Sequence, residues 1–414
     1  MIPPKLRVVA LSASVCCGFF AIAARADLNN VGEQLGTFVS DGSIALDLRY
    51  RYEFVDEDGF DESAKASLLR TRLILKSGKV GRVSAYLEID DIRSMGVEDY
   101  NSTENGKTQY PTIADPEGTE VNEAWFRYST EDLDATLGRQ RILLDGGRFV
   151  GIKPWRQNEQ TYDAARLQWK AASGLVVDAS YVTQVNRVFG PVDGSNPADW
   201  NGDSTFLRMS YPLGIGHELA GFAYLLDVQG QSDFNAAKTV NNSSNTFGIA
   251  YSGAFSGVDV LARLATQEPA RDSELSYRAP YYLVELAALL AGMRLKAAYE
   301  VLAADNGVGF ATPLANGHKH QGWADKFLST PGDGVKDAWV SLEGNLGPLA
   351  LTARYHDFSA ESSSVSFGTE IDLQAQWVIN DWLIATAKAA VFETDAPGRY
   401  PDTTKAWLIL RIRL

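Results

Sequence analysis

Cysteine is nearly absent from this sequence, and long apolar runs are scarce. The two cysteines of the 414-residue chain, Cys16 and Cys17, lie near its N-terminus. The remaining chain has no disulfide framework, so backbone pairing and packing must hold it together. After residue 26 the most apolar stretch, residues 281–295, is interrupted by Glu285 and Arg294. This pattern excludes membrane-spanning helices.

Positive charge is also in short supply, and the motifs of common enzymes are missing. The formal net charge of −14 argues against nucleic acid as a partner. There is no G-x-S-x-G, H-E-x-x-H or P-loop, so we expect no catalytic residues and not an enzyme. His318 and His320 lie in a long polar segment. We interpret them as solvated loop residues, and we expect no metal and no cofactor.

The N-terminal residues have the pattern of a targeting segment. Lys5 and Arg7 precede an apolar run over residues 8–23, and Ala-Arg-Ala follows at residues 24–26. A basic start, a short apolar run and small residues at a cleavage site are typical of a secretory signal peptide. We therefore expect residues 1–26 to be a signal peptide and the protein to be exported.

The rest of the chain alternates between apolar and polar residues. In residues 44–54, IALDLRYRYEF, one row is apolar or aromatic, and the other contains Asp47, Arg49, Arg51 and Glu53. Successive side chains of a β-strand point to opposite faces, so such a strand has one apolar wall and one charged wall. The pattern LRTRLILK at residues 69–76 places Arg70 and Arg72 together in the same way.

Eighteen segments of this kind can be counted, and the connections between them alternate in length. They begin near residues 44, 67, 80, 120, 133, 162, 174, 205, 217, 245, 257, 281, 292, 335, 348, 368, 381 and 404. Long polar connections are expected at residues 91–119, 145–161, 186–204, 229–244 and 304–334.

An even number of strands with short turns on one side and long loops on the other is typical of outer-membrane barrels. The sequence predicts an all-β, transmembrane, antiparallel up-and-down β-barrel of about 18 strands, with short periplasmic turns and long extracellular loops. We expect residues 27–43 to be a periplasmic segment and residues 44–414 to form the barrel. The alternative, a soluble β-sandwich or propeller, would pack the apolar rows into a core, and bulky charges on nearly every strand disfavour it.

If the apolar rows face lipid, the charged rows line a lumen that 18 strands make wide enough for an aqueous channel. Arginine rings in a water-filled pore select anions, and the guanidinium group binds a carboxylate through two N–H donors. For any single arginine the alternative is a cross-strand ion pair that stiffens the wall. The residues that alternation places in the lumen include Arg49, Arg51, Arg70, Arg72, Arg127, Arg139, Arg141, Arg166 and Arg354.

Residues 138–161, GRQRILLDGGRFVGIKPWRQNEQT, are unusually rich in arginine. Arg139 and Arg141 alternate with Gln140, and Arg148 and Arg156 follow in a glycine-rich segment. This segment is expected either to fold back into the pore and direct Arg148 at the channel axis, or to be an ordinary extracellular loop whose glycines form tight turns.

The same stretch resembles a known family. GRQRI, RFVG and WRQNEQTYDA are similar to the signature of the alginate-export family of outer-membrane porins. The resemblance implies an 18-stranded barrel with an arginine-lined pore that passes anionic uronate polysaccharide outward. It nominates Arg139, Arg141, Arg148 and Arg156, with Gln157 and Glu159. LDLRYRYE and LLRTRLIL also resemble the first strands of the family, which adds Arg49, Arg51, Arg70 and Arg72.

The sequence therefore predicts a porin that passes anionic solutes, with uronate oligo- or polysaccharides such as alginate among them. The alternatives are a general or substrate-specific diffusion porin for small anions or sugars, a plugged adhesion or binding barrel, and an outer-membrane hydrolase. The expected location is the bacterial outer membrane. The expected partners are outer-membrane lipid and lipopolysaccharide, the anionic solute or polysaccharide, and the barrel-assembly machinery.

Overall fold

The computed structural model describes residue 36 and residues 38–414. The expected signal peptide and most of the expected periplasmic segment lie outside the described residues. In the part of the chain that is described, no helix is long and apolar enough to cross a membrane.

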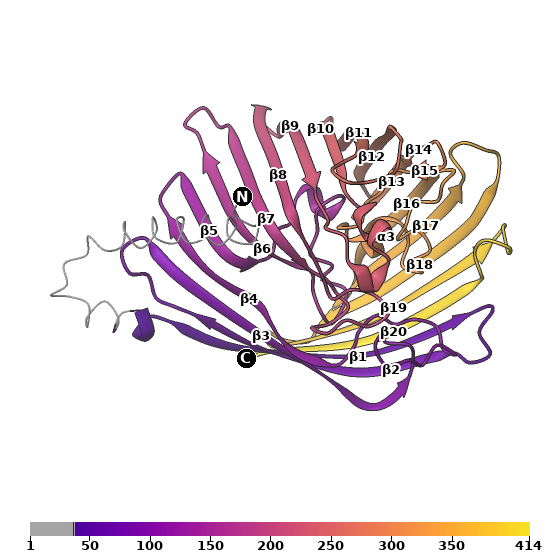
Figure 1. The fold of residues 1–414 in the computed structure, drawn as a ribbon, viewed down its shortest axis with the longest axis horizontal. Coiled ribbons are helices and arrows are strands. Elements are labelled where there is room, and N and C mark those ends of the chain that lie inside the picture. The colour runs from indigo at the N-terminus through magenta and orange to yellow at the C-terminus, as the bar shows by residue number, and fades with distance from the viewer. Residues whose placement is uncertain (1–35, 37) are drawn as a thin grey trace.

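Eighteen antiparallel strands form a single sheet that closes on itself (Figure 1). The first half contains β1 (Ser43–Glu57), β2 (Ala64–Lys76), β3 (Val83–Asp99), β4 (Gly118–Ser129), β5 (Leu133–Gln140), β6 (Thr161–Lys170), β7 (Val176–Asn186), β8 (Asp199–Gly214) and β9 (His217–Leu226). The second half contains β10 (Ser244–Phe255), β11 (Val258–Pro269), β12 (Ala279–Leu290), β13 (Met293–Leu302), β16 (Val335–Leu346), β17 (Leu349–Ser359), β18 (Ser366–Val378), β19 (Leu383–Thr394) and β20 (Thr403–Arg413). The predicted all-β barrel is confirmed.

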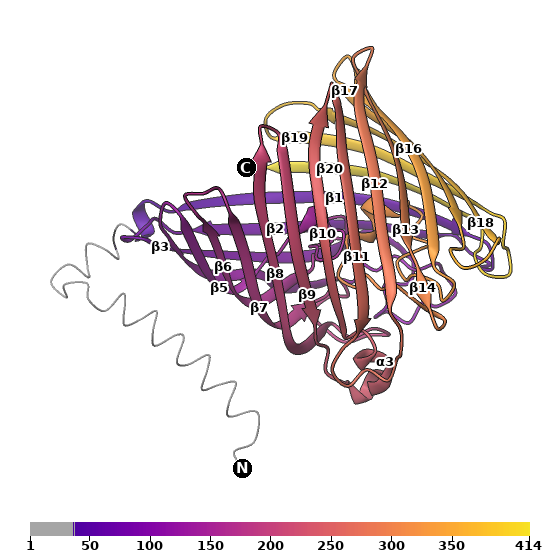
Figure 2. The same ribbon diagram turned by 90° about the horizontal axis from the view of Figure 1, so that it is seen from above.

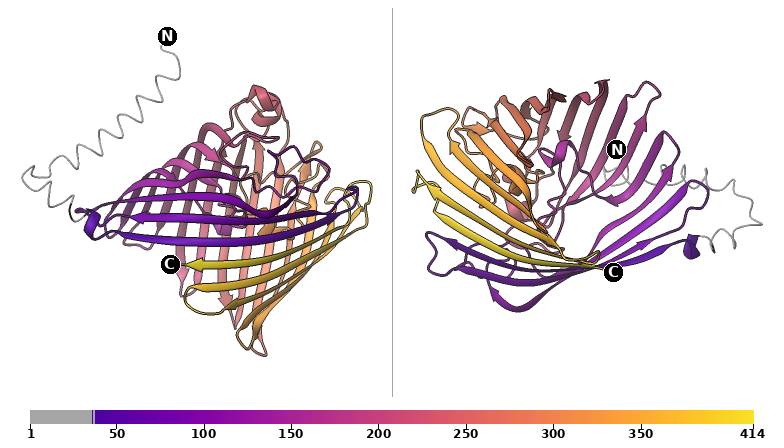
Figure 3. Two further views of the ribbon diagram at one scale, coloured as in Figure 1. Left: turned by 90° about the horizontal axis from the view of Figure 1, so that it is seen from below. Right: turned by 180° about the vertical axis from the view of Figure 1, so that it is seen from behind.

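The first and last strands form the seam of the barrel. Strand β1 pairs with β20 from Asp47 opposite Arg413 to Glu57 opposite Thr403, and Figure 3 shows the two strands side by side. Inside the seam, Arg411 of β20 donates to Asp47 at 2.6–2.7 Å. Closure leaves no strand edge unpaired, which a barrel in lipid requires.

Short turns lie at one end of the barrel and longer loops at the other. Eight turns join strands at the end where β1 begins and β20 finishes, and nine loops join them at the opposite end. The loop end contains the short elements η2 (Asp145–Gly147), η3 (Ser232–Phe234), α3 (Ala236–Val240), β14 (Ala304–Asp305), β15 (Val308–Gly309) and α4 (Gly317–His320). Figure 2 shows α3 among the loops at this end. The predicted alternation of connection lengths is confirmed.

The two faces of the sheet are reversed relative to a soluble protein. In β1, the inward Asp47, Arg49 and Arg51 are 4%, 8% and 1% exposed, while the outward Ile44 is 76% exposed. In β18, the inward Glu370 is fully buried and the outward Ile371 is 50% exposed. Apolar side chains on an outer surface are stable when lipid covers them. This arrangement therefore fits a membrane barrel and not a soluble β-sandwich.

Two strands extend further than alternation predicts. Strand β3 continues to Asp99 and β8 begins at Asp199, where the sequence indicates loops. The loop-end part of β3 shifts register against β2 between Ala66 and Leu68, which breaks the strict period. Irregular pairing of this kind removes the sequence signal without ending the strand.

The lumen is not empty at the loop end, because loops 141–160 and 303–334 fold into it. Their side chains join inward aromatic residues of the wall, and Phe149 packs against Tyr281 and Phe310 at ring-centroid distances of 5.0 and 5.9 Å. The two loops bring charged groups from distant parts of the chain into the barrel interior.

Candidate binding site in the barrel lumen

Loop 141–160 enters the barrel and meets loop 303–334 there. Asn316 donates its backbone N–H to the Gly147 carbonyl at 2.8 Å, and its side-chain oxygen accepts from the Lys153 N–H at 2.6 Å. A side chain on Gly147 or Gly151 would collide with Asn316, and Gly147 has a φ of 82°. The glycines of DGGRFVG therefore permit close approach between the loops as well as the turn.

Two arginines of β1 bind the backbone of this loop. Arg49 donates to the carbonyls of Pro154, at 2.9 Å, and Arg156, and to the Gln157 side chain at 2.8 Å. Arg51 donates to the Trp155 carbonyl at 2.6 Å. Their guanidinium groups therefore serve as anchors for the loop, and both are buried.

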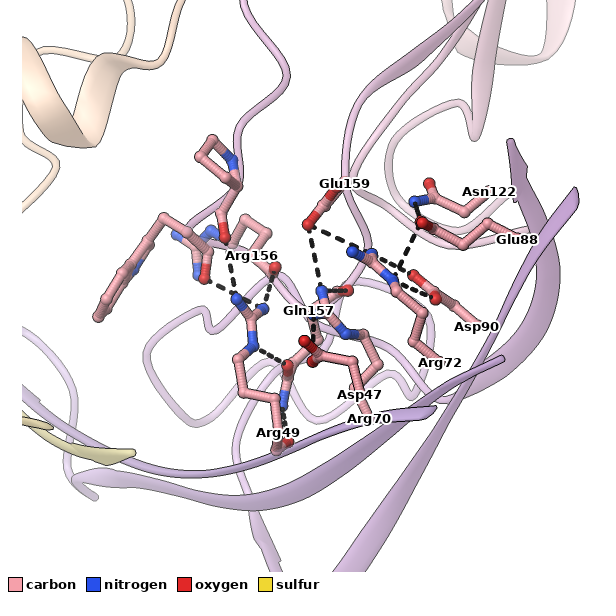
Figure 4. Close-up of polar contacts among 12 residues, drawn as sticks. Asp47, Arg49, Arg70, Arg72, Glu88, Asp90, Asn122, Arg156, Gln157 and Glu159 are labelled. Carbon is pink, nitrogen blue, oxygen red and sulfur yellow. Dashed lines mark hydrogen bonds and ion pairs between the residues drawn. The ribbon is translucent and has the colours of Figure 1, made fainter. Parts of the chain in front are cut away.

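Three further arginines surround Glu159. Arg70 and Arg72, both drawn in Figure 4, contact its Oε1 atom at 3.3 and 3.2 Å. Arg141 contacts its Oε2 atom at 2.6 Å. Burial alone would raise the pKa of Glu159, but these arginines, with Arg49, outweigh it and hold the pKa far below its usual range.

Wall carboxylates complete the neutralisation of this cluster. Arg72 also pairs with Asp90 at 2.6 Å and Glu88 at 3.0 Å, and Arg141 pairs with Glu88 and Glu123. We call the set Asp47, Arg49, Arg70, Arg72, Glu88, Asp90, Glu123, Arg141 and Glu159 the arginine network. Its five carboxylates outnumber its four guanidinium groups, so it presents little free positive charge to a solute.

Two arginines on β4 and β6, beside the arginine network, make simpler contacts. Arg166 pairs with Asp178 of the neighbouring strand through two N–H···O bonds at 2.9 and 2.5 Å. Arg127 donates to Thr136 at 3.0 Å and lies over the Trp125 ring at 4.4 Å. The alternative interpretation of an arginine as part of a cross-strand pair describes Arg166.

The structure places Arg139 on the outer face of the barrel, although the sequence predicts that it lines the lumen. It lies opposite Ala124 and Asp163 in the sheet and pairs with Asp163 at 2.7 Å. The adjacent Gln140 is 3% exposed and lies opposite the fully buried Tyr162, so Gln140 points inward and Arg139 outward. Arg141 reaches the interior because strand β5 ends at Gln140 and the chain turns inward there.

Arg148 does not point along an open axis either. It is fully buried, pairs with Glu300 of β13 at 2.6 Å and lies over the Tyr281 ring. Arg354 faces inward, donates to the Lys319 carbonyl at 3.0 Å and lies over Trp339 at 4.7 Å. Arg148 therefore fixes loop 141–160 to the wall, and Arg354 fixes loop 303–334.

A cavity of about 890 Å³ lies above these contacts at the loop end, among loops 141–160, 187–198, 227–243 and 303–334. We call it the vestibule. Two carboxylates, Asp233 and Asp325, are among its lining residues. Its cationic lining residues are Lys153, Arg156, Arg187, Lys238, Lys319 and Lys388. Unlike the arginine network, the vestibule has an excess of positive charge.

The floor of the vestibule is an ion cluster centred on Asp325. This carboxylate accepts from Lys405 at 3.0 Å, from His318 at 3.0 Å and from Arg156 at 3.4 Å. Burial alone would raise the pKa of Asp325, but Lys405, His318 and Arg156 hold it well below its usual range. The interpretation of His318 as a solvated loop residue is therefore wrong, because it lies inside the barrel, stacked on Trp155 at 4.3 Å.

Aromatic rings form one side of the same floor. Lys388 lies over the rings of Trp323, at 3.5 Å, and Trp155, at 4.0 Å, and its Nζ atom is 2.5 Å from His318 Nε2. Within the described residues no group of three or more potential ligands has metal-binding geometry. Cationic groups beside flat indole rings suit a solute that carries both a carboxylate and an apolar ring face.

Sequence analysis found Arg156 but missed most of the vestibule. Four of its cationic residues lie on loops, where there is no alternation of apolar and polar residues to predict side-chain direction. These residues are Lys153, Arg187, Lys238 and Lys319. The sequence could have predicted Lys388 as a lumen residue, because it is a lone lysine on the inward row of an alanine-rich strand. Enclosure of Lys153, helped by Arg187 and Arg156, lowers its pKa to about 7.

A family model described as alginate export matches residues 41–272, which is more than half of the chain. The chain belongs to the alginate export family. The resemblance of residues 138–164 to this family is therefore confirmed. No curated protein sequence matches the chain.

Solved structures match this family member over nearly its whole length. OccK3 (OpdO) of Pseudomonas aeruginosa has a TM-score of 0.69 at 14% identity, covering 93% of this chain and 99% of its own. OccAB2 of Acinetobacter baumannii has a TM-score of 0.67 at 13% identity, covering 92% and 99%. The outer membrane protein OpdK of P. aeruginosa has a TM-score of 0.67 at 14% identity, covering 91% and 99%.

At these identities the likeness shows a shared fold. Together with the family, it assigns the chain to the outer-membrane porins, which are channels. The family model covers β1 to β11 and so includes the arginine network and loop 141–160. The floor of the vestibule also draws on loop 303–334, β19 and β20, beyond the matched residues.

Proposed function

We propose that the protein is an outer-membrane channel selective for anionic solutes, and that the vestibule is where they bind. The observation that carries the proposal is the composition of the lining, six cationic side chains against two carboxylates. Unbalanced positive charge in an enclosed aqueous space concentrates anions and rejects cations.

The tryptophan rings favour acidic sugars among the anions. Trp155 and Trp323 line the vestibule beside Lys388, and Trp200 lines it beneath Arg187, whose guanidinium lies 4.1 Å from the ring centre. A uronate has a carboxylate for a cation and an apolar ring face for an indole. We therefore propose uronate oligo- or polysaccharides such as alginate as solutes of the channel.

The size of the vestibule supports a second candidate, a diffusion porin for small acidic sugars. A volume of about 890 Å³ is typical of a site for one small molecule. The contacts of Asn316 with loop 141–160 and of Asp325 with Arg156 join the two inner loops in the vestibule floor. We propose that passage of a polymer requires these loops to separate. Liposome swelling with monomeric and oligomeric uronates separates the two candidates.

The surroundings of the barrel follow from its outer face. We propose that lipid covers the apolar outward rows and that lipopolysaccharide surrounds the loop end. We also propose that the barrel-assembly machinery inserts the chain, since an 18-stranded barrel must close around its inner loops.

Reversal potentials in planar bilayers under a KCl gradient test the selectivity. We expect the wild type to prefer Cl⁻. Replacing Lys153, Lys238 and Lys319 with Gln together removes half of the vestibule cations, and we expect the Cl⁻/K⁺ permeability ratio to fall about twofold or more.

The matched control is Lys79→Gln, the same substitution at an exposed lysine in the short turn 77–82. The control should leave the ratio close to that of the wild type. A wild type with equal permeability to both ions would contradict the proposed function.

A further inference from the structure

We propose that Asp325 is a built-in competitor, whose carboxylate occupies the position in the vestibule floor where a solute carboxylate binds, and that an entering solute displaces it. The proposal rests on the proposed function and adds a regulatory step to the same site. In the resting channel the floor is then self-occupied.

The first support is the position of the carboxylate. Asp325 lies in the lining of the vestibule, and its side chain is only 6% exposed. The groups that hold it belong to three separate elements. Arg156 comes from loop 141–160, His318 from α4 and Lys405 from the barrel wall at β20. One carboxylate therefore ties both inner loops to the wall.

The second support is that Asp325 does not satisfy all the hydrogen-bond donors of Arg156. Its contact with Arg156 is 3.4 Å, longer than the 2.7–2.9 Å of a strong charge-assisted hydrogen bond. Arg156 Nη1 is buried without a hydrogen-bond partner among the described residues, and its nearest carboxylate, Asp115, is 3.7 Å away. The carboxylate of a solute could accept a hydrogen bond from Arg156 Nη1, which Asp325 does not use.

The third support is the backbone of Asp325. Its φ of 63° lies in the left-handed region, which aspartate and asparagine tolerate better than most residues. The ion pairs of Asp325 with Arg156 and Lys405 fix loop 303–334 at this residue. Loss of the pairs to a solute carboxylate would therefore allow loop 303–334 to relax away from Arg156 and open the floor.

Neighbouring charges agree with this arrangement. Lys388 lies beside His318, with its Nζ atom 2.5 Å from the ring Nε2. Burial and the Lys388 charge keep the pKa of His318 well below its usual range, so the ring is neutral and donates one hydrogen bond to Asp325. The charged groups that contact Asp325 are therefore Lys405 and Arg156.

The experiment measures block of single-channel current by glucuronate added at the loop end, with glucose as the neutral probe. Asp325→Asn removes the competitor, keeps nearly the same shape and tolerates the positive φ. We expect its half-blocking concentration for glucuronate to fall roughly tenfold, which corresponds to about 1.4 kcal/mol. Asp325→Glu restores a carboxylate and should return the value toward the wild type.

Asp233→Asn is the matched control. It removes one negative charge from the lining of the same cavity, but Asp233 is exposed and has no ion pair to Arg156 or Lys405. We expect less than about a twofold change, because a general charge effect is screened in water. An equal effect of both substitutions, or no effect of Asp325→Asn, would overturn the proposal.

A second measurement covers the case in which Asp325→Asn fails to fold, judged by the heat-dependent gel mobility of a closed barrel. Displacement of Asp325 should disturb the stack of His318 on Trp155, so glucuronate should change the tryptophan emission of the wild type saturably and glucose should not. No such change, at concentrations that block the current, would also overturn the displacement. The wild-type reversal potential separately decides whether the channel prefers anions.

Discussion

The arginine network contains four cationic groups and the vestibule six, and the two sets differ in whether their charges are neutralised. In the network, every arginine contacts a carboxylate or a loop carbonyl, and Arg70 and Arg72 are almost fully buried. In the vestibule, lysines such as Lys238 and Lys319 are exposed to water and are not paired with a carboxylate of the described residues. The network is structural, and we propose that the vestibule binds the solute.

The comparison shows why a count of inward arginines does not measure anion selectivity. A guanidinium that is already neutralised by a buried carboxylate stabilises the barrel but attracts a distant anion weakly. Selectivity depends on charge that is left over after the internal pairs are formed. In this barrel the excess lies in the vestibule.

The largest effect should come from breaking the network. Glu159→Gln removes the carboxylate that Arg70, Arg72 and Arg141 share. Loss of one partner from a buried ion network destabilises a protein by about 3–5 kcal/mol. We expect a loss of that order in the free energy of unfolding in detergent micelles, measured by urea titration.

The control for this change is Glu131→Gln, at an exposed residue in the turn between β4 and β5. Its unfolding free energy should stay within about 0.5 kcal/mol of the wild type. Equal losses for the two variants would remove the structural role that we assign to the network.

A smaller effect should appear in the pH dependence of selectivity. The pKa of Lys153 is lowered to about 7, so this lysine is charged below pH 7 and loses its charge as the pH rises through that value. The Cl⁻/K⁺ permeability ratio should therefore be higher at pH 6 than at pH 8, by less than about twofold, because Lys153 is one of six cations.

Substitution tests the assignment of this pH step. Lys153→Met should abolish it, while Lys238→Met, at an exposed lysine of the same cavity, should lower the ratio but retain the step. A step that persists in Lys153→Met would belong to another group.

The smallest effect should come from an exposed ion pair outside both regions. Arg399 and Asp333 form two N–H···O bonds at 2.7 and 2.8 Å between loops, and Arg399 is 39% exposed. Solvent-exposed pairs contribute about 0.2–1 kcal/mol, even with good geometry. Arg399→Ala should therefore shift the urea midpoint far less than Glu159→Gln, and a comparable loss would show that burial does not separate the two kinds of pair.

Sequence periodicity predicted the wall well because each strand has only two faces. Alternation placed Arg49, Arg72 and Arg166 inward correctly, and it failed at Arg139, where the inward row passes through Gln140. Near the end of a strand the alternation no longer determines direction, since the following loop can turn either way. The family resemblance supplied the barrel type, but it could not distinguish paired from free arginines.

The loops escaped prediction for a physical reason. The contacts of Asp325 join residues from loop 141–160, α4 and β20, which are far apart in the sequence. No local pattern encodes such a meeting, and only the closed barrel brings these groups together. The vestibule is therefore a product of the tertiary fold, although each of its lysines is visible in the sequence.

The seam between β1 and β20 has a consequence for biogenesis. Asp47 of the first strand receives Arg411 and Arg413 from the last strand. In a nascent chain that lacks its final strand, Asp47 does not have these two partners. Pairing of β20 with β1 therefore closes the barrel and completes this charge cluster in one step. A chain that terminates one strand early would then have an unpaired strand edge and an Asp47 carboxylate without Arg411 and Arg413. Quality-control proteases could recognise this combination.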